Sequence, residues 1–140
     1  MLLHIVARGK IGRSSEADLV NRYVKRIAWP IRITELAERG GTIPALPANS
    51  VTIALDERGQ ALSSIELARK LETWRDDGKR EARFLIGAAD GHAEAQRSEA
   101  DLLFSFGPAT WPHLLVRAML AEQLFRALSI LANHPYHREG

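Results

Sequence analysis

Short apolar runs alternate along the chain with longer segments in which apolar residues recur every three or four positions. The short runs have the length and punctuation of buried strands and cover residues 2–7, 31–37, 51–55, 82–86 and 102–106. The longer segments, residues 14–28, 63–77 and 112–132, have the period of helices, and a short helix follows residue 91. This alternation predicts an α/β fold with a mostly parallel sheet and helices on both faces. Since no repeat or linker interrupts it, we expect a single domain over residues 1–140.

Three of the predicted helices have recognisable start signals. Ser14 or Ser15 is placed to cap the first helix. Ser63 and Glu66 have the spacing of a capping box, in which each side chain binds a backbone N–H of the first turn. Pro112 suits the first position of the last helix, because its φ is fixed and it has no N–H to satisfy.

The last helix, residues 112–132, is apolar around most of its circumference, so it should be covered on several sides. A subunit interface is the simplest second cover. At 100° per residue His113 and Arg117 fall on one stripe, and Glu122 and Arg126 on the opposite one. One interpretation is that one stripe faces a pocket while the other meets a partner subunit. The alternative is an ordinary Glu122–Arg126 ion pair on a helix surface.

Composition narrows the class of protein. The 140 residues are 46% hydrophobic and 26% charged, and none is cysteine, which excludes thiol chemistry. The longest apolar stretch, residues 114–131, is interrupted by charges and does not resemble a membrane span. Arg8 and Lys10 directly follow the first apolar run, unlike the order in a secretory signal. We therefore expect a cytoplasmic protein without a membrane segment.

Positive charge is concentrated near the N-terminus. The formal net charge is only +2, yet residues 1–40 carry eight Lys and Arg against four Asp and Glu. A polyanion would approach this end of the chain. The alternative is a solvated helix face that happens to be basic.

Ligands of open parallel sheets bind outside the carboxyl ends of the strands, which directs attention to three loops. The first follows Leu55, where residues 56–59 predict a charged turn. The second, residues 87–91, resembles a nucleotide loop but lacks the spacing of a dinucleotide motif, and a turn that needs glycine explains it equally well. The third, residues 107–112, is stiffened by two prolines. His134 and His137 do not assemble a metal site, because no further donors are grouped nearby.

An ordered set of motifs in residues 51–140 resembles a known family. They are Leu55-Asp56, Phe84-Leu-Ile-Gly87 with Gly91 four residues on, Ser105-Phe106, Thr110-Trp-Pro-His113, Arg117, Glu122-Gln-Leu-Phe-Arg126 and His134-Pro-Tyr-His-Arg-Glu139. This series is similar to that of the bacterial pseudouridine N3-methyltransferases of large-subunit ribosomal RNA, within the SPOUT superfamily. Two departures are Ala88, where the family usually has glycine, and a shortened segment 39–50 without the usual helix.

The resemblance implies an α/β fold with a C-terminal trefoil knot, assembled as a homodimer with its active sites at the subunit junction. It also implies S-adenosylmethionine as cofactor, without a metal. The cofactor residues carried over are Leu55, Gly87, Phe106, Gly107, Pro108, Ala109, Thr110 and Trp111. The implied substrate is a pseudouridine in a stem-loop of 23S rRNA, at the subunit interface of the assembled 70S ribosome.

Roles for individual residues follow from the implied reaction, in which N3 of pseudouridine must lose a proton before methylation. His137 has the character of a general base, with Tyr136 as its orienter or as an alternative base. Arg126 would hold the carbonyl oxygens of the uracil anion. His113 would order the third loop or contact RNA. The expected RNA-binding residues are Arg8, Arg22, Arg26 and Arg138.

Two other functions fit the same motifs less closely. One is a SPOUT methyltransferase that acts on a different RNA nucleotide, against which the tail motif 134–138 argues. The other is a ribosome-binding module without catalysis, which would have no need of the cofactor.

Overall fold

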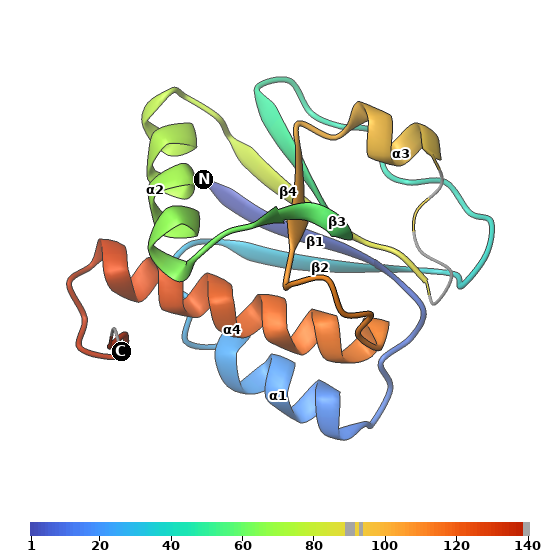
Figure 1. Cartoon of the computed structure of the whole chain (residues 1–140), viewed down its shortest axis with the longest axis horizontal. Coiled ribbons are helices and arrows are strands. Elements are labelled where there is room, and N and C mark those ends of the chain that lie inside the picture. The colour runs from blue at the N-terminus through green and yellow to red at the C-terminus, as the bar shows by residue number, and fades with distance from the viewer. Residues whose placement is uncertain (89–91, 93, 139–140) are drawn as a thin grey trace.

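The computed structural model describes residues 1–88, 92 and 94–138, so Gly91 and Glu139 of the motifs above lie outside it. Strands and helices alternate as predicted (Figure 1). In chain order they are β1 (Leu2–Arg8), α1 (Ser15–Val24), β2 (Ile31–Leu36), β3 (Ser50–Ala61), α2 (Ser64–Asp76), β4 (Glu81–Ile86), α3 (Glu94–Glu99), β5 (Leu102–Ser105) and α4 (His113–Leu131).

The strands form one five-stranded sheet in the order β2-β1-β4-β3-β5, and every pairing is parallel. The parallel-sheet prediction is therefore confirmed. Because all strands run in one direction, the loops that follow them gather at the same edge of the sheet. This carboxyl edge is where a site should lie.

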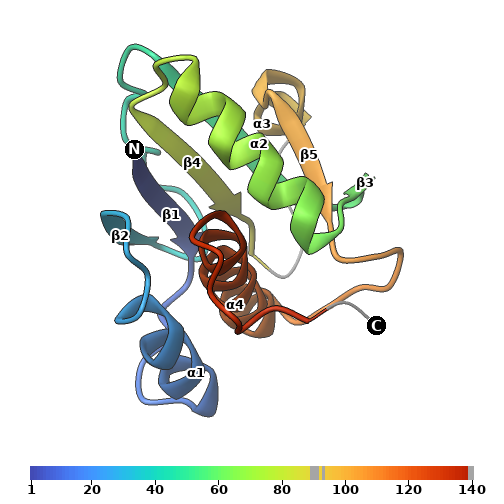
Figure 2. The ribbon, with the colours of Figure 1, turned by 90° about the vertical axis from the view of Figure 1, so that its left-hand side faces the viewer.

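Each face of the sheet has its own apolar cluster. On the larger face, Ile5, Ile53 and Phe84 pack with α2 and α4, and they are fully buried. α1 extends this layer by packing on α4 (Figure 2). On the other face Val6 and Leu85 form a smaller cluster, and α3 lies on that side, behind β5 in Figure 2. None of the helices in the described residues is long and apolar enough to cross a membrane.

The segment between β2 and β3 is held by a buried ion pair. Within residues 37–49 the chain has no helix or strand, as the shortened sequence predicts. Arg83 of β4 donates from Nη1 to the carbonyl oxygen of Pro44 at 2.6 Å and from Nη2 to that of Ala45 at 3.3 Å. Its Nε donates to Glu81 at 3.1 Å. Two buried charges therefore fix a segment that lacks regular structure of its own.

The predicted charged turn at residues 56–59 is wrong, because β3 continues through it to Ala61. The register of β3 against β5 shifts here, so that Leu55 and Gln60 both pair with Phe104. Residues 56–59 thus form a bulge. A Cβ on Gly59 would lie 2.7 Å from Phe104 N, so glycine is what lets the two backbones approach.

The helix starts agree closely with the sequence. Ser14 caps α1 by accepting a hydrogen bond from Ala17 N. Ser63 and Glu66 form the complete capping box of α2. Pro112 is the N-cap residue of α4 rather than its first helical residue, because its ψ of 135° is extended. The helix therefore begins at His113, one residue later than predicted.

Candidate functional site

A cavity of about 220 Å³ opens at the carboxyl edge of the sheet. It is bounded by the three strand-end loops picked out in the sequence and by the first turn of α4. Of the eight residues expected to bind a cofactor, seven line it: Leu55, Gly87, Phe106, Gly107, Ala109, Thr110 and Trp111. Pro108 lies outside the lining. His113, one of the four residues given a catalytic role, also lines the cavity.

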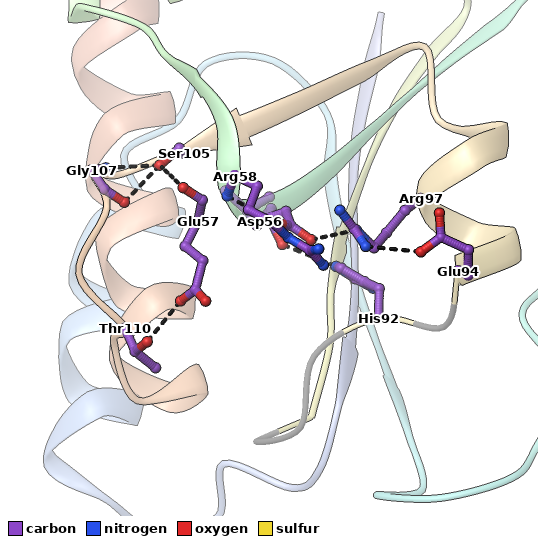
Figure 3. A network of polar contacts seen from close by, with 10 residues as sticks. Asp56, Glu57, Arg58, His92, Glu94, Arg97, Ser105, Gly107 and Thr110 are labelled. Carbon is purple, nitrogen blue, oxygen red and sulfur yellow. Dashed lines mark hydrogen bonds and ion pairs between the residues drawn. The ribbon is translucent and has the colours of Figure 1, made fainter.

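The rim of the cavity is closed by hydrogen bonds between the β3 bulge and the loop after β5 (Figure 3). Thr110 Oγ1 donates to the Glu57 carboxylate at 2.7 Å. Ser105 Oγ accepts from Gly107 N at 2.9 Å and lies 3.3 Å from the Glu57 carbonyl oxygen. Gly107 has a φ of 104°, which a side chain would strain. The sequence pattern indicated no role for Glu57 in the site, because only the bulge brings it to this loop.

A second group of polar contacts links the bulge to α3. Arg97 lies 2.8 Å from the Asp56 carboxylate, and Arg58 N donates to the same side chain at 2.8 Å (Figure 3). Partial burial raises the pKa of Asp56. The hydrogen bond from Arg58 and the positive charges of Arg97 and Arg58 outweigh this effect and hold the pKa below its ordinary value of 3.8. Asp56 is therefore ionised in the cavity wall, with its charge paired to Arg97 and Arg58.

His92 is a further cavity residue that the sequence analysis missed. Its Nε2 lies 3.1 Å from the Leu55 carbonyl oxygen, to which it donates, so it holds the residue that precedes the first loop. Burial lowers the pKa of His92 below 6.5, although the hydrogen bond to Leu55 and the charge of Asp56 act in the opposite direction. The ring is neutral at pH 7.

This buried imidazole predicts a loss of stability in mild acid. As the pH falls below 6.5, His92 takes up a proton in the unfolded chain but resists it in the folded one, so the folded state is disfavoured. We expect His92→Gln to lose about 4 °C less in Tm than wild type between pH 7.5 and 5.5, measured by thermal melting. The matched control is His134→Gln, at an exposed position. Equal losses in wild type and His92→Gln would contradict the prediction.

The other three residues given catalytic roles form a cluster at the opposite end of α4. Arg126 donates from Nε and Nη2 to Glu122 Oε1, at 2.8 and 2.6 Å. Its Nη1 lies 3.2 Å from His137 Nδ1, and its guanidinium lies over the Tyr136 ring, 4.8 Å from the centroid. Tyr136 donates its hydroxyl hydrogen to Glu122 at 3.1 Å. Glu122 thus joins Arg126, Tyr136 and His137 in what we call the tail cluster.

These contacts determine which ring nitrogen of His137 accepts a hydrogen bond, and they keep the Tyr136 hydroxyl protonated. Because Arg126 donates to Nδ1 of His137, the neutral imidazole carries its hydrogen on Nε2, which is buried and has no hydrogen-bond partner. Burial, a hydrogen bond with Tyr23 and the charge of Glu122 raise the pKa of Tyr136 to about 12. The phenol therefore stays protonated at neutral pH, which favours an orienting role over that of a base.

The cavity and the tail cluster are far apart within one chain. His113 begins α4 beside the cavity, whereas Arg126 lies thirteen residues along the same helix. At about 1.5 Å per residue this separates them by roughly 20 Å along the helix axis. Figure 1 shows the C-terminus at the end of α4 remote from the loop that precedes it. A single chain does not bring His137 to the cavity.

The four residues expected to bind RNA are dispersed. Arg22 and Arg26 are exposed in and just after α1, and Arg138 is exposed in the tail. Arg8 donates from Nη1 of its guanidinium to the carbonyl oxygens of Ala37 and Gly40. In the described part of the chain there is no group of three or more His, Asp or Glu side chains that could hold a metal ion.

The parallel sheet and the cavity at its strand ends define an α/β protein of the class that binds a small ligand at the carboxyl edge of its sheet. A sequence profile described as "Predicted SPOUT methyltransferase" matches residues 1–137, and the chain belongs to this family. Its relatives include proteins named "Ribosomal RNA large subunit methyltransferase H". That of Rhizorhabdus wittichii is 70% identical over 140 residues, and that of Erythrobacter litoralis is 66% identical over 140, each covering 100% of both chains.

A solved structure shares the fold. It is that of a probable methylase family protein from Haemophilus influenzae, with a TM-score of 0.60 and 11% sequence identity. The match covers 98% of this chain and 70% of the other. At this identity the similarity supports the fold alone.

Proposed function

We propose that this protein transfers a methyl group from S-adenosylmethionine to N3 of a pseudouridine in 23S rRNA. The observation that carries the proposal is the meeting of three strand-end loops around one cavity, with seven of the expected cofactor residues in its wall. The name shared by the relatives supports a large-subunit rRNA substrate. The tail motif 134–138 supports pseudouridine N3 as the position.

The cavity residues fit the cofactor chemically. Phe104, Phe106 and Val116 offer an apolar wall for the adenine ring. Glu57 offers negative charge to its cationic groups, whereas the charge of Asp56 is paired with Arg58 and Arg97. Backbone groups of the expected residues Leu55, Gly87 and 106–111 would hold the molecule. When bound, the cofactor supplies an electrophilic methyl carbon.

The separation of the cavity from the tail cluster supports a homodimer. A site that uses both must take the cavity from one chain and the tail cluster from another, and a two-fold axis then gives two equal sites. A groove between α1 and α4 offers a surface for the second copy. Its lining is mostly apolar and consists of Leu19, Tyr23, Phe106, Leu115, Ala118, Met119, Glu122 and Gln123.

The tail cluster suggests how the proton leaves N3. In the free chain an N–H of Arg126 occupies Nδ1 of His137. The N3–H of pseudouridine is a donor of the same kind and would replace it, after which the proton passes from N3 to Nδ1. The released Arg126 N–H then binds a uracil carbonyl oxygen and stabilises the anion. Tyr136 keeps Glu122 and Arg126 in place, and His113 orders the cavity loop.

The remaining parts of the proposal concern assembly and substrate context. The chain acts as one domain over residues 1–140, with a trefoil knot at its C-terminal part, on assembled ribosomes in the cytoplasm. Arg22, Arg26 and Arg138 contact rRNA. A domain of this size offers limited surface for choosing one nucleotide, so a preformed ribosomal surface supplies part of the recognition.

The test is transfer of labelled methyl from S-adenosylmethionine to ribosomes that lack the modification. Assembled ribosomes, free large subunits and naked 23S rRNA are compared, and the labelled nucleotide is mapped. We expect label at the stem-loop pseudouridine of assembled ribosomes alone. Label on another nucleotide would overturn the substrate assignment, and absence of cofactor binding would overturn the enzymatic role.

A further inference from the structure

A buried arginine, Arg117, ties α4 to the loop that follows β1. Arg117 is 1% exposed, its Nη1 forms an ion pair with Glu35 of β2, and its Nη2 donates to the Gly9 carbonyl oxygen at 3.0 Å. The same Glu35 oxygen accepts from Ile11 N at 2.8 Å. The backbone on both sides of Lys10 is therefore held by one ion pair.

This ion pair is charged and costly to bury. Partial burial raises the pKa of Glu35, but the hydrogen bond from Ile11 and the charge of Arg117 hold it below the ordinary 4.5. The Nε of Arg117 is buried without a hydrogen-bond partner. Apolar residues of similar volume often stabilise a fold as well as a buried ion pair does. A contribution to stability therefore does not explain well why an arginine is buried at position 117. The backbone that Arg117 holds in place explains it better.

The loop that it holds begins next to His113, one of the residues that line the cavity. A Cβ on Gly9 would be 3.3 Å from Nε2 of His113, which lines the cavity. Lys10 and Arg13 are exposed in this loop, and Gly12 between them has open space around it. Two exposed cations thus lie in a loop whose backbone is held at Gly9 and Ile11, and Gly9 is next to a residue of the cavity lining.

We infer that the loop of residues 9–13 binds the RNA phosphates that flank the target nucleotide, through Lys10 and Arg13. Arg117 and Glu35 are its positioning residues. The inference rests on the proposed function, since it takes the substrate to be RNA. It adds a phosphate site, and the residues that position it, to the RNA-binding residues expected from the sequence.

The first experiment measures the affinity of the enzyme for ribosomes at several salt concentrations. Each phosphate contact with single-stranded RNA contributes about 0.7 to the slope of log affinity against log salt. We expect the double variant Lys10→Ala/Arg13→Ala to lower the slope by about 1.4 and the affinity at least tenfold at 0.1 M salt, with cofactor affinity within twofold of wild type. The matched control is Arg69→Ala/Arg80→Ala, which removes two exposed charges elsewhere. An unchanged slope in the loop variant overturns the inference.

The second experiment tests the positioning pair with Arg117→Lys and Glu35→Gln. Lysine keeps the charge but cannot bind Gly9 and Glu35 with a planar fork, so we expect it to reproduce the lowered slope. Glu35→Gln should show part of the same change. If either variant lowers the slope while cofactor affinity stays within twofold, the pair positions the loop. A wild-type slope in both, or loss of cofactor affinity in both, assigns the pair to the fold and overturns its positioning role. Failure of wild-type enzyme to bind ribosomes would instead refute the proposed function.

Discussion

Replacement of His137 by alanine is expected to slow methyl transfer to ribosomes about 100- to 10,000-fold, the usual range for loss of a general base. In the proposed mechanism Nδ1 of His137 receives the N3 proton, and the side chain lies 3.2 Å from Arg126, which stabilises the resulting anion. Loss of the imidazole therefore removes the proton acceptor and also releases Arg126 from its partner. The measurement is the single-turnover rate at saturating cofactor.

The matched control for this prediction is His134→Ala, an exposed histidine in the same tail. It should methylate at a rate within threefold of wild type. Cofactor affinity should be equal in both variants, because neither residue lines the cavity. A His137→Ala enzyme that keeps more than a third of the wild-type rate would contradict the role of His137 and leave positioning as the main source of rate enhancement.

Two inactive variants should restore activity to each other when they are mixed. His137→Ala removes the tail function, and Gly107→Val removes the cavity, because valine resists the φ of 104° that this loop requires. Random exchange of subunits gives heterodimers in about half of the molecules, and each has one site with an intact cavity and an intact tail. We therefore expect about a quarter of the wild-type activity after unfolding and refolding the variants together.

The mixing experiment would contradict a site shared between two subunits if no activity returned. If cavity and tail of one chain served the same site, every heterodimer would carry two broken sites and no activity would return. Each variant refolded alone gives the background rate. Far-UV circular dichroism of each homodimer, matched to wild type, shows that Gly107→Val still folds and contributes its tail.

Local signals predicted the start of α2 and the sheet type correctly. The capping box of Ser63 and Glu66 needs only residues three apart, so it can be read without tertiary structure. The end of the first helix was less accurate, since α1 stops at Val24 whereas the pattern runs to residue 28. The cavity was placed correctly because parallel topology alone brings the three strand ends to one edge.

The features that the sequence did not predict depend on contacts between distant segments. Residues 56–59 have the composition of a turn, and only the close approach of Gly59 to β5 makes them part of a strand. His92 forms a hydrogen bond with the carbonyl oxygen of Leu55, which is 37 residues away in the sequence. Burial of Glu81 and Arg83 in β4 likewise depends on a segment between β2 and β3 that has no periodic pattern.

The hydrogen bonds from Arg83 to the segment between β2 and β3 affect how the sequence of this protein can change in evolution. Arg83 holds residues 44 and 45 through their main-chain oxygens, which every amino acid possesses. Mutations in the segment therefore leave the contact intact, and its sequence is free to drift. Glu81 and Arg83 have less freedom, because loss of Glu81 leaves the buried Arg83 without a carboxylate partner, and loss of Arg83 leaves the buried Glu81 with His4 as its remaining side-chain partner. We expect substitutions to accumulate over residues 42–47 while the two charged residues of β4 change, if at all, together.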